Sequence, residues 1–135
     1  MSTEQINHFL NHFGRKINAP LSLKEGVCAL VDPQQLEVAV VELPLESDCV
    51  LFHCRIEAVS DSDSAGFLKT LLALNFEMNA MRGCWLALEG EESLRLCTQQ
   101  PVAGLDAGSF TLSLEGFILQ AQQVRAFIAE LRQAA

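Results

Sequence analysis

The first 20 residues follow the apolar and polar spacing of a helix. Four apolar residues recur at intervals of three and four, namely Ile6, Phe9, Leu10 and Phe13. Residues with this spacing share one face of an α-helix. Ser2 or Thr3 can cap its start, and Gly14 and Pro20 are expected to end it. The pattern therefore predicts a short amphipathic helix.

Three segments with a period of two come next. Residues 27–31 alternate, and residues 32–35 (DPQQ) have the composition of a turn. Residues 36–43 (LEVAVVEL) are rich in β-branched side chains and end before Pro44. Residues 49–58 alternate most clearly, so one face is expected to be buried and the other solvated. The buried face would be formed by Val50, Phe52, Cys54 and Ile56. We predict three strands, of which the first two form a hairpin.

A second helix is predicted in residues 67–78 (FLKTLLALNFEM), after the cap-forming residues 61–63. Leu74 and Met78 widen its apolar surface beyond one stripe, and such a helix has to be covered on both sides. Gly83 then leads into residues 84–99, which are expected to form a second hairpin. Its inward residues would be Leu86, Leu88, Leu94 and Leu96.

The longest helical pattern lies in the last 30 residues. Asp106 can cap a helix whose apolar residues continue in steps of three and four from Phe110 to Leu131. The predicted order is helix, three strands, helix, two strands and helix, which is an α+β fold with an antiparallel sheet. No linker-like composition interrupts residues 1–135, so we expect a single domain.

Composition adds an expectation about partners. Half of the residues are apolar and the mean hydropathy is +0.23, so apolar residues in excess of a small core favour dimerisation. The formal charge is −8 and the pI is about 4.7. A negative charge of this size repels phosphate backbones and anionic lipids, so we expect no nucleic-acid partner.

The cysteines and the hydropathy profile favour the cytoplasm. Five cysteines, an odd number without CxxC spacing, lie mostly in apolar segments, as thiols do in a reducing compartment. Residues 1–16 lack the apolar core of a signal peptide, and no segment approaches about 18 consecutive apolar residues. We expect no insertion into a membrane.

Candidate catalytic and metal-binding groups are few. His8 and His12 have a spacing that can place two imidazoles on one metal, but no third ligand is near them in the sequence. His53 and Cys54 are neighbours on a predicted strand, where they point to opposite faces. The glutamates of residues 89–92 fit a solvated loop. No phosphate loop or nucleophile motif is present. We therefore predict a protein that is not an enzyme and has no catalytic residue, metal site or cofactor.

Several large apolar residues are either partner contacts or ordinary core. They are Phe9, Phe13, Phe76, Met78, Met81 and Trp85. Aromatic residues and methionine are enriched where proteins bind partners, and the pattern alone leaves both readings open.

Residues 71–118 carry an order of features that points to a family. A leucine-rich helix ends in Leu74-Asn75-Phe76, and a strand led by Gly83 ends in acidic residues. A leucine-rich strand follows, and a helix then begins after Leu105-Asp106. In these features, and in its size and acidity, the chain resembles the class I type III secretion chaperones, the Tir chaperone family. The sequence departs from the pattern at Met81-Arg82, where small residues are more usual.

The resemblance implies a cytoplasmic bacterial homodimer with a twisted sheet. Such a chaperone binds the N-terminal segment of a type III secreted effector and keeps it soluble, partly unfolded and competent for secretion. The dimer interface would be formed by Leu71, Leu74, Met78, Met81, Trp85 and Leu86. The effector groove would be lined by Ile6, Phe9, Leu10 and Phe13, with Val27 and Leu30 beside them. A contact with the secretion-system ATPase is also compatible with the resemblance.

Two other functions are compatible with the same pattern. One is an interaction domain of the same fold that serves a bacterial regulator. The other is a protein that binds a small ligand on its sheet face, which would need a pocket with converging polar groups.

Overall fold

The computed structural model describes residues 2–134. Its helices are α1 (Ser2–Ile17), α2 (Ala65–Leu74), α3 (Met78–Met81) and α4 (Ala107–Ala134). Its strands are β1 (Val27–Val31), β2 (Glu37–Glu42), β3 (Cys49–Ala58), β4 (Trp85–Glu89) and β5 (Ser93–Pro101). The predicted α+β order of elements is confirmed, with the short helix α3 added after α2.

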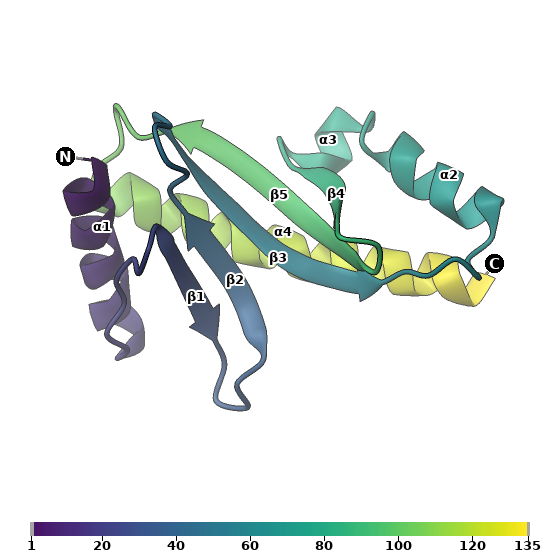
Figure 1. Cartoon of the computed structure of the whole chain (residues 1–135), viewed down its shortest axis with the longest axis horizontal. Coiled ribbons are helices and arrows are strands. Elements are labelled where there is room, and N and C mark those ends of the chain that lie inside the picture. Colours follow the sequence, from purple (N-terminus) through teal and green to yellow (C-terminus); the bar gives the residue numbers. More distant parts are fainter. Residues whose placement is uncertain (1, 135) are drawn as a thin grey trace.

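The five strands form one antiparallel sheet in the order β1-β2-β3-β5-β4. The chain leaves β3 through α2 and α3, returns as β4, and places β5 beside β3 (Figure 1). The two longest strands therefore lie at the centre of the sheet, and the short strands β1 and β4 form its edges. The predicted antiparallel sheet is confirmed.

Helix α4 covers one face of the sheet, and α1 stands across one end of the molecule (Figure 1). The core is built around Phe110 of α4. Its ring lies 5.4 Å from that of Phe9 and 5.5 Å from that of Phe52, measured between ring centroids. Phe52 also contacts Phe117, at 5.9 Å. One aromatic cluster therefore joins α1, β3 and α4.

Helix α1 ends later than predicted. It passes through Gly14 and continues to Ile17, where Asn18 adopts a left-handed conformation with φ 57°. Gly14 is required for packing, because a Cβ atom there would lie 2.3 Å from the carbonyl oxygen of Ala19. The glycine therefore allows the chain to turn back closely against the helix.

The second helical segment is also shorter than predicted. Ser64, one residue beyond the predicted cap cluster, is the N-cap, and its Oγ accepts a hydrogen bond from the Phe67 amide at 3.1 Å. Helix α2 ends at Leu74, and the next residue, Asn75, directs its side chain toward β4. At α4, the predicted cap is confirmed, since Asp106 Oδ1 accepts from the Ser109 amide at 2.7 Å.

Candidate functional site

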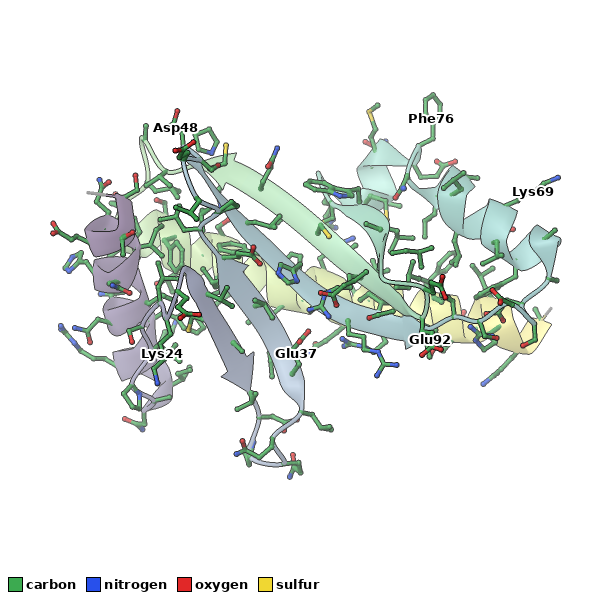
Figure 2. The ribbon with its side chains drawn as sticks, in the orientation of Figure 1. Lys24, Glu37, Asp48, Lys69, Phe76 and Glu92 are labelled. Carbon is green, nitrogen blue, oxygen red and sulfur yellow. The ribbon has the colours of Figure 1, made fainter. Side chains whose placement is uncertain are left out.

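A group of large apolar side chains is exposed on α2, α3 and β4. We call it the α2–β4 surface, and its members are Leu68, Leu72, Phe76, Met78, Trp85 and Leu88. Phe76 is 81% exposed, Leu72 is 74% exposed and Met78 is 73% exposed. Phe76 projects away from the body of the molecule (Figure 2). Exposed apolar side chains gathered in one place are typical of a protein interaction site.

The surface arises because α2 buries only part of its apolar residues. Phe67 and Leu71 point into the core, whereas Leu68 and Leu72, each one residue further along, point to solvent. An apolar cleft of about 420 Å³ separates α2 from β4. Leu88 lines this cleft and is exposed, contrary to the prediction that it faces inward. It lies on the edge strand, where no helix of residues 2–134 covers it.

Asn75 holds the edge strand in place. Its Oδ1 accepts a hydrogen bond from the Leu86 amide at 2.7 Å, and its Nδ2 donates to the Leu86 carbonyl at 3.2 Å. These are outward backbone groups of an edge strand, which another strand would otherwise use. Asn75 therefore blocks sheet extension at Leu86, near the beginning of β4, and leaves the neighbouring side chains free to make contacts.

The predicted interface residues divide into two groups. Met78 and Trp85 are exposed, and Leu74 is half-buried. Leu71, Met81 and Leu86 are buried within the chain's own core. The departure at Met81-Arg82 has a local cause, because Met81 fills the core and Arg82 adopts φ 53° in the turn before Gly83. The sequence did not predict that Leu68, Leu72 and Leu88 are exposed at this surface, because their apolar spacing resembles that of their buried neighbours.

The predicted effector-binding residues are mostly inside the molecule. Five of the six are at most 5% exposed, namely Ile6, Phe9, Leu10, Phe13 and Leu30. Only Val27 is exposed, at 38%. The structure brings five of these side chains into the core between α1, the sheet and α4, and it leaves Val27 on the edge strand β1.

A cleft of about 700 Å³ lies where β1 and β2 approach the first turn of α1. It is lined on one side by Ser2 and Thr3 and on the other by Val27, Leu43 and Leu45. Leu45 is 96% exposed, so an apolar side chain is available at its rim. The cleft adjoins the edge strand β1, where the backbone amide and carbonyl of Val27 are already bonded to Lys24, so an extended peptide could bind here through side-chain contacts.

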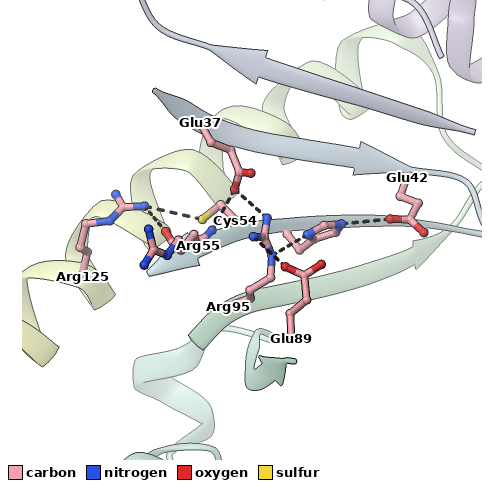
Figure 3. Close-up of polar contacts among 8 residues, drawn as sticks. Glu37, Glu42, Cys54, Arg55, Glu89, Arg95 and Arg125 are labelled. Carbon is pink, nitrogen blue, oxygen red and sulfur yellow. Dashed lines mark hydrogen bonds and ion pairs between the residues drawn. The ribbon is translucent and has the colours of Figure 1, made fainter. Parts of the chain in front are cut away.

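The sheet face opposite α4 carries an ionic cluster around a buried arginine (Figure 3). Arg95 of β5 is 8% exposed and donates from Nη2 to Glu37 of β2 at 2.6 Å. It also donates from Nε to Nδ1 of His53 on β3 at 3.0 Å, and its Nη1 lies 3.4 Å from Glu89 of β4. One side chain therefore links four strands, and its bonds within the chain favour a structural role.

The thiols show no sign of activation. Burial raises the pKa of Cys54 to about 11, and burial also raises the pKa of Cys28, Cys84 and Cys97. A thiol is a nucleophile only as the thiolate, so these four side chains are poor nucleophiles near neutral pH. His53 bonds Arg95 on the opposite face of β3 from Cys54. No group of three metal-binding side chains occurs in residues 2–134.

Comparison with known proteins assigns a family to this geometry. The sequence profile described as the Tir chaperone protein (CesT) family matches residues 8–125. No curated protein sequence matches the chain. Within residues 2–134, no helix is long and apolar enough to span a membrane.

Three solved structures have a similar fold. A chain of the ExsC–ExsE complex has a TM-score of 0.77 and 20% identity, over 93% of this chain and 95% of that chain. A chain of the HopA1–SchA chaperone–effector complex has a TM-score of 0.72 and 17% identity, over 93% and 97%. A chain from the complex of the Yersinia pestis type III secretion chaperone SycH with a stable fragment of YscM2 has a TM-score of 0.60 and 13% identity, over 87% and 97%.

Proposed function

Because the chain belongs to the Tir chaperone protein (CesT) family, we propose that it binds the N-terminal segment of a type III secreted effector. It would keep that segment soluble, partly unfolded and competent for secretion in the bacterial cytoplasm. The family match over residues 8–125 is the observation that carries the proposal. A contact with the secretion-system ATPase stays a prediction.

The α2–β4 surface is proposed as the homodimer interface. Apolar side chains that are 36% to 81% exposed lie together there, and covering them with a second copy removes them from water. Asn75 blocks the backbone of β4 at Leu86. The contact between copies would therefore be made by side chains of α2, α3 and β4 and not by one continuous sheet.

The effector segment is proposed to bind at the opposite edge of the sheet. The cleft beside β1 offers Val27, Leu43 and Leu45 to apolar side chains of an extended client. Because the backbone of Val27 is bonded to Lys24, the client would be held there by side-chain contacts. The predicted residues Ile6, Phe9, Leu10 and Phe13 would form the floor that holds α1 beside this cleft. A client held in this way stays extended and is not refolded.

The experiment combines the size of the purified chain with identification of its client. Light scattering is expected to give a dimer, and affinity capture from the host under secreting conditions is expected to yield one dominant protein, bound through its N-terminal region. Phe76→Asp with Met78→Asp should give a monomer that remains folded. Leu119→Asp is the matched control, because Leu119 is 55% exposed on α4, outside the proposed interface.

A second pair of substitutions tests the client site. Val27→Asp with Leu45→Asp should weaken client capture at least about tenfold and leave the dimer intact. A chain that is monomeric and captures no protein would contradict the chaperone function and favour the small-ligand alternative. A dimer that captures a cytoplasmic regulator, and no secreted protein, would favour the regulatory alternative.

A further inference from the structure

The charge of this acidic chain is distributed unevenly. Residues 1–24 contain three Lys and Arg against one acid, a net charge of +2. Residues 25–135 contain six Lys and Arg against 16 acids, a net charge of −10, and the two values add to −8. The basic part of the chain is α1 and the loop after it. It stands at the end of the molecule opposite α2 (Figure 1).

The core packing of α1 turns its basic residues outward. Its buried face is apolar, and the side chains of His8, His12, Arg15 and Lys16 are exposed on the other face. Arg15 forms no hydrogen bond or ion pair with another residue of 2–134. In contrast, Arg95, Arg125 and Arg132 are all bonded within the chain. Arg15 is therefore available to an external acidic group.

A shallow groove of about 640 Å³ runs between this face and the beginning of α4. His12, Arg15 and Lys16 form its α1 side, and Leu112 lies on its α4 side with 71% of its surface exposed. Lys16 pairs with Glu115 at 2.8 Å, but the two side chains are 56% and 40% exposed. Such a surface pair contributes little, so Lys16 can exchange this partner for another carboxylate.

We propose that this groove docks an acidic, amphipathic segment of a second protein, different from the effector client. Carboxylates of the segment pair with Arg15 and Lys16, and an apolar residue of the segment covers Leu112. Arginine suits this role because its guanidinium can bind a carboxylate through two parallel hydrogen bonds. The rest of the chain, at −10, repels a long polyanion. A short protein segment therefore fits better than nucleic acid or a membrane.

The groove and the proposed client cleft are separate. The client cleft includes Ser2 and Thr3 at the start of α1, whereas the groove begins at His12. Nine helical residues correspond to about 14 Å along the axis. A second protein can therefore bind the groove whether or not the other cleft is occupied, and the inference does not depend on the proposed function.

The test measures binding of a labelled twelve-residue peptide of glutamate and leucine to the full chain by fluorescence anisotropy. A peptide with lysine in place of glutamate serves as the reference probe. The acidic peptide should bind more tightly at about 50 mM than at about 300 mM salt, and the lysine peptide should not bind at the groove. Arg15→Glu with Lys16→Glu should weaken binding of the acidic peptide at least about tenfold, and Leu112→Ser should weaken it further.

The control variant changes the total charge equally at another place. Lys69→Glu with Arg82→Glu also lowers the net charge by four, and Lys69 lies on α2 at the far end of the molecule (Figure 2). This variant should keep its affinity for the acidic peptide. Equal losses in both variants would overturn the proposal, as would equal binding of the two peptides. Tighter binding of phosphatidylglycerol vesicles or duplex DNA, lost in the Arg15 and Lys16 variant, would also overturn it.

Discussion

Helices α1 and α2 are both short and both carry a leucine- or phenylalanine-rich stripe, but they expose different residues. All four stripe residues of α1 are buried, and its outer face is polar and basic. Helix α2 buries Phe67 and Leu71 and exposes Leu68 and Leu72. The two ends of the molecule therefore differ. The apolar residues of α1 are buried in the chain's own core, whereas α2 has exposed apolar residues that a partner could cover.

The two ends also differ in how they are tied to the sheet. Helix α1 is held by the aromatic cluster of Phe9, Phe110 and Phe52. Helices α2 and α3 place fewer apolar side chains in the core, namely Phe67, Leu71 and Met81, and they also rely on polar anchors. Asn75 bonds β4, and Gln120 of α4 donates to the carbonyl of Ala80 at 2.8 Å. A large apolar contact area is more costly to lose than a few hydrogen bonds, so the α2 end should open more easily.

The largest expected effect compares one leucine from each helix. Leu10→Ala in α1 should lower the free energy of unfolding by about 2–5 kcal/mol, because it removes a fully buried side chain and leaves a cavity. Leu72→Ala in α2 should change the unfolding free energy of the isolated monomer by no more than about 0.5 kcal/mol. Urea denaturation in the Phe76→Asp with Met78→Asp background separates folding from dimerisation. Similar losses at both positions would contradict the comparison.

A smaller effect is expected from the asparagines that anchor the two ends. Asn75→Ala removes both side-chain bonds to Leu86 and should cost about 1–3 kcal/mol. Asn7→Ala in α1 removes one bond, from the Leu23 amide at 2.7 Å, and should cost less. Hydrogen exchange at the Leu86 amide should accelerate in the first variant and stay unchanged in the second. An unchanged Leu86 amide in Asn75→Ala would show that β4 is held by other contacts.

The smallest expected effect is the pH-dependent stabilisation of the start of α2 by Asp63 and Arg132. Hydrogen bonds from Arg132 and from the Ser60 amide hold the pKa of Asp63 below its ordinary value near 3.8. A carboxyl group whose pKa is lower in the folded state stabilises the fold when the pH is above its ordinary pKa. This stabilisation is lost as the pH falls through the lowered pKa of the folded state. Arg132 also lies 4.5 Å from the centre of the Phe67 ring. Arg132→Gln should therefore lower Tm by about a few degrees at pH 7.

The pH dependence of that variant is its specific test. The difference in Tm between the wild type and Arg132→Gln should shrink as the pH falls below about 4, because Asp63 becomes protonated and its ion pair with Arg132 is lost in the wild type as well. A difference that stays constant from pH 7 to pH 2.5 would mean that the helix is supported by the packing of Arg132 on Phe67 or its bond to the Ala58 carbonyl, and not by Asp63.

Much of the fold follows from local patterns in the sequence. The alternation of residues 49–58 correctly places Val50, Phe52, Cys54 and Ile56 in the core, because side chains of a strand alternate between its two faces. The Asp106 cap was equally readable. The role of Asn75 could not be predicted in this way, since it depends on a bond to Leu86, which is 11 residues away and becomes a neighbour only after β4 has joined the sheet.

The candidate site was harder to read than the fold. Leu71 and Leu72 are the same residue type and adjacent, yet Leu71 is 5% exposed and Leu72 is 74% exposed. Periodicity marks both as apolar and cannot distinguish core from interface. The basic end was visible in the charges of residues 1–24, but its groove requires α4 beside α1, and α4 begins about 90 residues later.

The sequence by itself determined the order of the elements, the apolar stripe of each helix and the separation of basic from acidic segments, because these depend on spacing over a few residues. The tertiary structure decided which stripes were covered. Phe9 and Phe13 are buried because α4 and the sheet meet them, whereas Leu72 and Phe76 remain exposed. Whether a side chain is buried depends on which distant elements of the chain pack against it. Only the folded structure therefore distinguishes core residues from exposed apolar residues that a partner could cover.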